Sequence, residues 1–426
     1  MTGLPSIEIQ PVISGIDSPG SAVERPLCVC FYVFFPAGGI GRYTNELARA
    51  LGARSDVEVE VACTPDFQWA HDPGYRTWTG LRSISHPIPL LRRSRFLRAQ
   101  FANPVRFLRR AVNAGTDIIH FANVNHLSFP YWRRELEESG LRVAISVHDV
   151  KRQKPILNKA WEEHQLKAVY RIADALFVHS AYQADELVTY AGVARDKIHI
   201  VPHGPYPHGH VAHDAADVRK RLGLPLDRQV ALFFGQLRDE KNLAGLIRAL
   251  PLSKNRPHLL VAGEGGGAHR GADFYRDLAR KVGVADRVTF LARYIPDEEV
   301  GELFAASDWV ALPYSNSFTS QSGVLNIAAH YERPVLVSSS PVLHETVRRS
   351  DIGVACDGDE PGALAAGIDQ LCTQVMNNYS YAFAQYRQQF SWDENARLTS
   401  EVYRRMLLAK PRRISVGGGT SVGLTV

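Results

Sequence analysis

Short apolar runs alternate with longer amphipathic stretches along most of this chain, and this alternation restricts the fold more than any other feature. The first run, Leu27 to Phe35, is rich in Val, Phe and Tyr, as is typical of a strand buried on both faces. A glycine-rich loop follows at residues 38–41, and then Tyr43, Leu47 and Leu51 recur at helical spacing. Strand, glycine loop and helix in this order form the first unit of a doubly wound α/β domain.

Five further apolar runs in the first half of the chain have the length of strands, and most are separated by stretches long enough for helices. They are Val57 to Ala62, Asp117 to Phe121, Val143 to Val147, Ala175 to His179 and Ile198 to Val201. Strands that alternate with helices pair in a parallel sheet that has helices on both faces.

A second series of strands follows a segment rich in Pro, Gly and His at residues 202–210, which suits a connection between domains. The expected strands are Gln229 to Phe234, His258 to Ala262, Arg287 to Leu291, Trp309 to Leu312 and Pro334 to Val337. A chain of 426 residues is also too long for one ordinary hydrophobic core. The fold class we expect is α/β, with two doubly wound Rossmann-like domains at residues 25–206 and 207–390 that face each other across a cleft.

The two ends of the chain have signatures of their own. Residues 1–24 are rich in Pro, Gly and Ser and are expected to be flexible, and residues 413–426 are expected to be a disordered tail. Before that tail, Ser391 stands three residues ahead of Glu394, which is typical of a capped helix start. We therefore expect a C-terminal helix within residues 391–412.

Composition excludes several classes of protein. With 45% hydrophobic and 22% charged residues of mixed sign, the chain is globular and not disordered or fibrous. Its longest uncharged apolar stretch, Leu27 to Ile40, is shorter than the roughly 18 residues needed to cross a bilayer. The first 24 residues lack the features of a secretory signal, and the five cysteines are odd in number and include no CxxC. We expect a cytoplasmic protein with reduced cysteines.

Two segments at expected strand ends are candidates for anion binding through the main chain. The glycines at residues 38–41 would let an anion approach the start of a helix, although a tight strand-to-helix turn would use the same residues. The small polar residues from Ser315 to Ser322 supply hydroxyls and free backbone amides at the next helix start. A simple helix cap is the alternative there.

Arg238 and Lys241 follow the strand that ends at Phe234 and stand three residues apart just before a helix. Two cations so placed can converge on one diphosphate, Arg through its planar fork and Lys as a point charge. The alternative is a solvated loop with an internal ion pair to Asp239 or Glu240.

The order of these pieces resembles a glycosyltransferase of the GT-B fold, family 4 (glycosyltransferase group 1), a retaining group that uses nucleotide sugars. The resemblance extends from about Leu27 to Leu408 and rests on the order and spacing of motifs that are each weak alone. They are Gly38-Gly39-Ile40-Gly41-Arg42-Tyr43, Val147-His148-Asp149, Val178-His179-Ser180, Val201-Pro202-His203-Gly204, Gly235 to Asn242, Val261 to Gly265, Val288 to Leu291, Ala306 to Tyr314 and Arg333-Pro334-Val335. It implies that the C-terminal helix crosses back to the first domain.

The resemblance implies catalytic roles for His148, Arg238 and Lys241. Arg238 and Lys241 would neutralise the donor diphosphate in place of a metal ion, and so stabilise the charge that develops on the leaving group. His148 matches the family histidine that contacts the transferred sugar, although a histidine at a strand end is also often bonded to backbone. Asp149 would lie near the acceptor.

Further residues of the donor site follow from the same resemblance. Besides Arg238 and Lys241, the expected phosphate-binding residues are Gly39, Gly41, Gln321, Ser322 and Gly323. The expected nucleobase-binding residues are Tyr294 and Ile295.

One departure from the family pattern concerns its acidic pair. The family typically has Glu, seven residues and Glu near the last phosphate-binding helix, the first touching the sugar and the second the ribose. The matching positions here are Thr319 and Ile327, and neither is acidic. This leaves open a different choice of donor and a catalytically inactive relative.

Residues 73–116 contain nine arginines and no acidic residue, so the rest of the chain carries a formal charge of −4 against +5 for the whole. Between Arg92 and Arg110 the arginines interleave with aromatic and aliphatic residues, as in segments that lie on anionic membranes. A solvated helix face packed on its own domain and a nucleic-acid surface are alternatives, but no nucleic-acid motif accompanies the charge. We favour the membrane because family members commonly extend lipid-linked saccharides.

Together these features predict a hexosyltransferase-type enzyme of class EC 2.4. It would move a sugar, with retention, from a GDP- or UDP-linked donor to a saccharide acceptor that is lipid-linked in polysaccharide or glycan biosynthesis. We expect no cofactor, no metal and no nucleic-acid partner, and peripheral attachment to the inner face of the cell membrane. The alternatives are a nucleotide-sugar epimerase on the same fold and a non-catalytic sugar-nucleotide binder. A nicotinamide oxidoreductase is disfavoured because the glycine loop lacks GxGxxG with its acidic partner.

Overall fold

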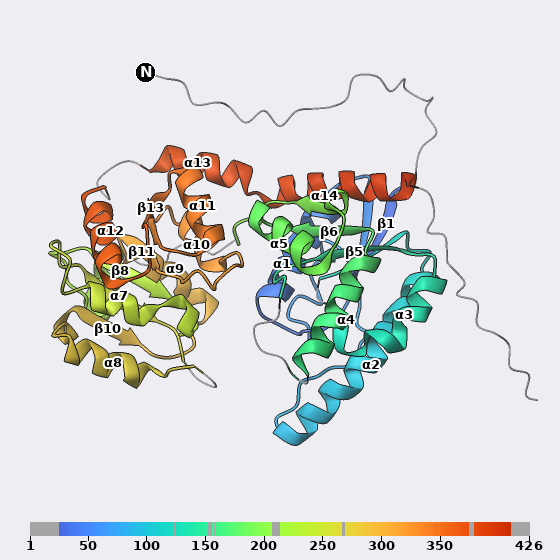
Figure 1. Ribbon diagram of the computed structural model, residues 1–426, viewed down its shortest axis with the longest axis horizontal. Helices are drawn as coiled ribbons and strands as arrows, with labels where there is room; N and C mark the ends of the chain where they lie inside the picture. Colours follow the sequence, from blue (N-terminus) through green and yellow to red (C-terminus); the bar gives the residue numbers. More distant parts are fainter. Residues whose placement is uncertain are drawn as a thin grey trace, which may run out of the picture.

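Two parallel β-sheets, each covered by helices on both faces, make up the protein (Figure 1). The computed structural model describes residues 25–122, 124–151, 156, 158–206, 214–265, 269–374 and 379–409. The ends expected to be flexible or disordered, residues 1–24 and 413–426, lie outside the described residues. So do residues 207–213, next to the expected domain boundary.

The first sheet has seven parallel strands in the order β3-β2-β1-β4-β5-β6-β7. The strands are β1 (Leu27–Tyr32), β2 (Val57–Ala62), β3 (Arg76–Trp78), β4 (Ile118–Phe121), β5 (Arg142–Ser146), β6 (Ala175–Val178) and β7 (Ile198–Ile200). The α-helices among them are α1 (Gly39–Gly52), α2 (Pro89–Asn113), α3 (Phe129–Glu138), α4 (Lys159–Ile172) and α5 (Ala181–Ala191).

The second sheet has six parallel strands in the order β10-β9-β8-β11-β12-β13. The strands are β8 (Val230–Phe234), β9 (His258–Ala262), β10 (Val288–Leu291), β11 (Trp309–Leu312), β12 (Val335–Val337) and β13 (Gly353–Ala355). The α-helices of this half are α6 (Ala215–Arg221), α7 (Leu243–Ala249), α8 (Ala272–Lys281), α9 (Asp297–Ala305), α10 (Gly323–His330), α11 (Pro341–Ser350), α12 (Pro361–Gln374) and α13 (Ser380–Gln389).

The apolar runs form strands because both faces of each sheet are buried. In β1, Cys30 and Tyr32 belong to one hydrophobic core, while Val29 and Phe31 belong to the core on the opposite face. Alternate side chains of a strand point to opposite faces, so a strand covered on both sides must be apolar throughout. The predicted fold class is therefore confirmed.

Two strands escaped prediction, and one predicted strand is shorter than its apolar run. The strands β3 and β13 have three residues each and lie at sheet edges, too short for a recognisable pattern. The run from Leu27 to Phe35 leaves the sheet after Tyr32. Its last residues, Phe34 and Phe35, thereby become available to the cavity described below.

The last helix, α14 (Trp392–Leu408), crosses back to the first domain as predicted (Figure 1). Ser391 caps it, since its hydroxyl accepts a hydrogen bond from the amide of Glu394 at 3.1 Å. Asn395 Nδ2 donates to the backbone oxygen of Pro202 at 2.6 Å, and Tyr403 packs in a core of the first sheet.

Each sheet has one point where the strand order reverses, between β1 and β4 in the first and between β8 and β11 in the second. Loops at the carboxyl ends of strands diverge at such a point and leave a crevice where ligands bind in open α/β sheets. A ligand-binding site is therefore expected at the loops that follow these four strands.

Candidate active site

A cavity of about 830 Å³ lies between the two domains and is lined by loops at the carboxyl ends of the strands. The first domain supplies residues that follow β1, β4, β5, β6 and β7 and residues of α2, and the second supplies residues that follow β8, β9 and β11. Of the predicted site residues, the cavity brings together Gly39, His148, Asp149, Arg238, Gln321 and Gly323. Gly41, Lys241, Tyr294, Ile295 and Ser322 are not part of its lining.

Arg238 and Lys241 are held by the loop after β8. Arg238 lines the cavity, and its Nε lies 3.2 Å from Glu240 Oε1 without the geometry of a hydrogen bond. The loop therefore contains the ion pair that the sequence offered as an alternative. Arg238 nevertheless keeps 34% of its side chain exposed toward solvent, so the pair leaves it accessible to a ligand.

Lys241 stands three residues after Arg238 in the same loop, and it is only 7% exposed. Its Nζ is 5.5 Å from the centre of the Tyr314 ring, and a Cβ on Gly235 would stand 3.1 Å from it. The pKa of Lys241 is lowered to about 7, mainly by burial and also by Arg238, while Glu240 acts in the opposite direction. The ammonium form of Lys241 is therefore destabilised at this position.

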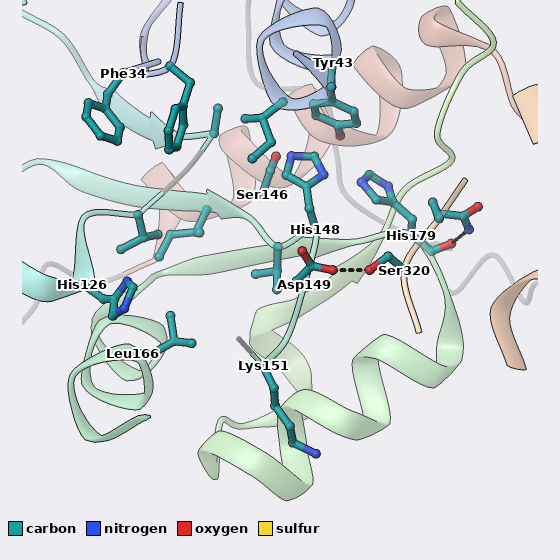
Figure 2. A pocket seen from close by; sticks show the side chains of 18 of the residues that line it. Phe34, Tyr43, His126, Ser146, His148, Asp149, Lys151, Leu166, His179 and Ser320 are labelled. Atoms are coloured by element: carbon teal, nitrogen blue, oxygen red, sulfur yellow. Dashed lines mark hydrogen bonds between the residues drawn. The ribbon is translucent and has the colours of Figure 1, made fainter. Parts of the chain in front are cut away.

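The polar loop before α10 contacts the first domain. Ser320 donates a hydrogen bond to the Asp149 carboxylate (Figure 2), and Gln321 Nε2 donates to the backbone oxygen of His179 at 3.2 Å. Ser322 is buried at the N-terminus of α10, where the first backbone amides of any helix lack intrahelical partners. The side chain of Gln321 is thus committed to the first domain, and the main chain at Gly323 faces the cavity.

His148 stands at the end of β5, half-buried in the wall opposite this loop (Figure 2). Its ring meets Tyr43 edge-on at 4.7 Å and lies 5.6 Å from His179. Burial lowers the pKa of His148 to about 3, and nearby His203 acts in the same direction. Its Nε2 is buried and has no hydrogen-bond partner among the described residues. His148 is therefore a neutral imidazole with one ring nitrogen left for a ligand.

The glycine loop divides into one residue at the cavity and one away from it. Gly38 has φ 94°, and a Cβ on Gly39 would meet nothing within 4 Å, so the start of α1 is open to a ligand. A Cβ on Gly41 would stand 3.0 Å from the Trp69 ring. Gly41 therefore permits the packing of Trp69, and its expected contact with the donor has no counterpart in the cavity lining.

Tyr294 and Ile295 follow β10 at the edge of the second sheet, away from the cavity lining. Tyr294 is 68% exposed, whereas the side chain of Ile295 packs in a core of the second domain. Ile327, at the position of the second acidic residue of the family, is also buried in that core. Thr319 is absent from the lining, but its neighbour Ser320 is part of it.

Several cavity residues escaped prediction. Phe34, Phe35, Phe96, Gln100, Asn125 and His126 line the first-domain half. Phe34 and Phe35 stand just before the glycine loop, and this position was a signal that reasoning from sequence could have used. Gln100 lies on α2, far from any expected strand end, and nothing in the sequence marks it.

Within the described ranges, no group of three or more His, Cys, Asp or Glu side chains has an arrangement that would hold a metal ion. The Arg and Lys side chains among the described lining residues are Arg238 and Lys151. Lys151 is paired with Glu186 at 2.9 Å, and Lys241 is buried close to Arg238.

Comparisons with known proteins cover both halves of the chain. Residues 37–205 match the family model described as glycosyltransferase family 4, and residues 214–389 match the model described as glycosyl transferases group 1. The chain is similar to the D-inositol 3-phosphate glycosyltransferase of Streptomyces coelicolor, with 30% identity over 267 residues, which is 57% of each chain. That of Nocardia farcinica is 30% identical over 252 residues, 56% of this chain and 54% of the relative. The chain thus spans little more than half the length of these curated relatives.

Solved structures share the whole fold at low identity. Sucrose-phosphate synthase from Thermosynechococcus elongatus superposes with a TM-score of 0.70 and 20% identity over 91% of this chain and 100% of that one. HepE from Anabaena, in complex with UDP, superposes with a TM-score of 0.69 and 15% identity over 89% and 100%. These structures show the two-domain GT-B fold. With matches to both family models along its two domains, the chain belongs to the group 1 glycosyltransferases of family 4.

Proposed function

We propose that this protein transfers a sugar from a nucleoside diphosphate sugar to a hydroxyl group of a saccharide acceptor. The proposal rests mainly on one observation: Arg238, with Lys241 behind it, faces His148 and Asp149 across a single cavity that both domains line. This arrangement puts cations where a diphosphate would leave and polar groups where a sugar and its acceptor would meet.

The donor is expected to carry a diphosphate, with UDP or GDP as the nucleotide. HepE, which shares the fold, has been solved with UDP and with UDP-glucose, and this supports UDP. The diphosphate would lie between Arg238 and the N-terminus of α10, where the helix dipole favours an anion. Gly39 on the opposite wall leaves room for the donor at the start of α1.

The proposed reaction retains the anomeric configuration. The bond from the anomeric carbon to the diphosphate oxygen breaks while the acceptor oxygen bonds on the same face, and the acceptor proton passes to the leaving diphosphate. No enzymic nucleophile is needed. Consistent with this, the carboxylates among the described lining residues, Asp149 and Glu240, are engaged with Ser320 and Arg238.

The reaction is also proposed to be independent of metal ions. Arg238 and Lys241 would supply the positive charge that a divalent cation provides elsewhere. Activity should therefore survive EDTA. Loss of activity in EDTA that Mg²⁺ or Mn²⁺ restores would contradict this part of the proposal.

The protein is proposed to bind an anionic membrane surface, and α2 is the helix proposed to contact the lipids. Within the described residues no helix combines the length and hydropathy needed to span a bilayer. One face of α2 packs on the domain, and the other exposes both cations and apolar side chains. At the N-terminal end of the helix, the exposed residues include Ile88 just before α2 and Leu90, Leu91, Arg92, Arg93, Arg95, Leu97, Arg98 and Phe101 within it. Arginines beside apolar side chains suit a bilayer interface.

Not every arginine of the basic segment takes part. Arg110 binds Glu60 with a charge-assisted hydrogen bond of 2.5 Å, and Arg76 binds Glu58 at 2.9 Å. Arg92, Arg93 and Arg98 form no ion pair within the described part of the chain. The first turns of α2, which project from the domain in Figure 1, therefore carry the uncompensated charge. A lipid-linked acceptor would be presented at this end.

Product analysis tests the proposal. The protein is incubated with UDP- and GDP-sugars, with and without candidate saccharide acceptors, and the products are separated. A glycosidic product formed only when donor and acceptor are both present supports transfer. Conversion of the donor into an epimer supports the epimerase, and binding without any product supports an inactive relative. Either of the last two results overturns the proposal.

A further inference from the structure

The first-domain half of the cavity contains two buried amide oxygens that no other described residue bonds. Gln100 and Asn125 are 5% and 2% exposed, and within the described ranges neither Gln100 Oε1 nor Asn125 Oδ1 has a hydrogen-bond partner. The other end of the Asn125 amide is fixed, since Nδ2 donates to the Tyr32 hydroxyl at 2.9 Å. Buried polar groups normally have partners, and both residues line the cavity. Two acceptor oxygens in one cavity favour a ligand with hydroxyl donors.

Beside these amides the cavity wall is apolar. Phe35, Phe96, Val124 and Leu127 line the cavity and are half-buried, so each keeps surface that a ligand can cover. Phe34 connects two of them, with ring centres 4.6 Å from Phe35 and 6.0 Å from Phe96. A sugar ring alone would leave this wall in contact with water.

The cavity has room for more than the donor. Its volume of about 830 Å³ lies near the upper end of the range of roughly 300–1,000 Å³ for ligand pockets. The apolar wall and the two amides belong to the first domain and line the same cavity as His148 and Asp149. Figure 2 shows Phe34 on one side of this hollow, and His126 and Leu166 on the other.

We propose that this half of the cavity is a subsite for an amphipathic glycoside, in which Gln100 and Asn125 accept hydrogen bonds from hydroxyls of the acceptor ring and Phe35, Phe96, Val124 and Leu127 cover an apolar aglycone. The inference rests on the proposed function, because the ring must lie within reach of a donor sugar. It names the chemical class of the acceptor, a hydroxylated ring joined to an apolar group. That group is aliphatic in a lipid and aromatic in an aryl glycoside.

One helix, α2, is proposed to contact both the ring and the aglycone of this ligand. Phe96 and Gln100 are four residues apart on α2 and so lie on the same face. Val112, on the same helix, is 50% exposed and is absent from the lining. Substitutions at Phe96 and Val112 therefore remove apolar groups of one helix from inside and outside the cavity.

Calorimetric titration in the presence of UDP tests the subsite without requiring transfer. The probes are methyl, octyl and phenyl glucosides, galactosides and mannosides, each below its micelle concentration. For at least one sugar, the octyl or phenyl glycoside should bind at least tenfold more tightly than the methyl glycoside. If only the octyl glycoside binds more tightly than the methyl glycoside, the aglycone is aliphatic. If only the phenyl glycoside does so, the aglycone is aromatic. Equal affinity within every sugar, or no binding by any probe, overturns the inference.

Variants separate the two parts of the subsite. Phe96→Ala should abolish the preference for the apolar aglycone and leave methyl glycoside affinity unchanged, whereas Val112→Ala should change neither. Gln100→Met should lower the affinity for methyl and octyl glycosides by the same factor, at least fivefold. The unfolding midpoint and the affinity for UDP report whether each variant is folded. A preference that persists in Phe96→Ala overturns the inference.

Failure of this inference is distinguishable from failure of the proposed function. If UDP binds and donor sugar is transferred or hydrolysed, but the aglycone has no effect on affinity, only the subsite is wrong. If no nucleoside diphosphate binds, the proposed function itself fails.

Discussion

The hydroxyl of Ser320 donates a hydrogen bond to the carboxylate of Asp149, and this bond joins the loop before α10 in the second domain to the loop after β5 in the first (Figure 2). Gln321 Nε2 repeats the connection by donating to the backbone oxygen of His179. The two walls of the cavity are thus held together at the place where the donor sugar and the acceptor are proposed to meet.

Ser320→Ala should lower kcat about tenfold, because the donor wall and the acceptor wall lose a direct connection that positions them for reaction. The unfolding midpoint should change little, since the bond lies at the exposed rim of the cavity. Steady-state kinetics and thermal unfolding check this.

Ser317→Ala is the matched control for Ser320→Ala. Ser317 is exposed in the same loop, and its hydroxyl bonds that of Ser315 at 2.7 Å within the second domain. An equal loss of kcat in both variants would show that the loop, and not the bond to Asp149, is responsible.

Arg238→Ala and Lys241→Ala should each raise the barrier for transfer by roughly 2 to 4 kcal/mol, the range found for preorganised groups that stabilise developing charge. Arg248→Ala is the control, since Arg248 is an exposed cation on α7, the helix that directly follows this loop. Initial rates at saturating donor provide the measurement. Unchanged rates in both test variants would refute the phosphate assignment.

Much of the fold was predictable because each sheet is buried on both faces, so most of its strands are largely apolar. Ser391 and Glu394 likewise indicate the start of α14 through local capping chemistry. The strand β3 lies at a sheet edge, where burial does not impose an apolar pattern.

The candidate site was predictable where residues follow strands and unpredictable where tertiary packing decides. His148 and Arg238 stand at strand ends and reach the cavity. Gly41 belongs to the same glycine motif as Gly39, yet one residue of α1 faces Trp69 and the other the cavity, because successive residues of a helix point in different directions. Gln100 reaches the cavity only because α2 packs against the first sheet.

Binding of UDP should weaken as the pH rises above 7. Burial lowers the pKa of Lys241 to about 7 in the unliganded protein, and a bound diphosphate would raise it. Binding above pH 7 then takes up a proton, so the affinity falls by up to about tenfold per pH unit. Titration calorimetry in buffers of different ionisation enthalpy measures this uptake. Lys241→Met should show neither the uptake nor this pH dependence.

The same pKa affects folding stability with a definite sign. Because the pKa of Lys241 is lower in the folded protein than in the unfolded chain, the unfolded chain binds more protons between about pH 7 and 10.5. The contribution of Lys241 to the free energy of unfolding therefore rises through this range. Urea unfolding of wild type and Lys241→Met should reveal this difference, and parallel pH profiles would contradict it.

Simultaneous replacement of Arg92, Arg93, Arg95 and Arg98 by Gln should abolish sedimentation of the protein with anionic vesicles. Each arginine near the surface contributes about 1 kcal/mol, and salt should weaken the attraction. Donor hydrolysis should stay intact, since these side chains are exposed on α2.

A control for the vesicle experiment removes four arginines elsewhere. Suitable positions are the exposed Arg133, Arg134 and Arg280 and the half-buried Arg276, each already paired with a nearby carboxylate. This variant should sediment like the wild type. Failure of wild-type protein to bind anionic vesicles even at low salt would exclude membrane attachment through α2.

The most direct test of the central claim is the titration of UDP and GDP into wild-type protein and the Arg238→Ala/Lys241→Ala double variant, in buffer that contains EDTA. At least one nucleoside diphosphate should bind the wild type without metal and, at a hundredfold excess over its dissociation constant, stabilise it by about 2.7 kcal/mol. The double variant should show neither effect. Equal binding by both proteins, or binding by neither, would contradict a donor site built on Arg238 and Lys241.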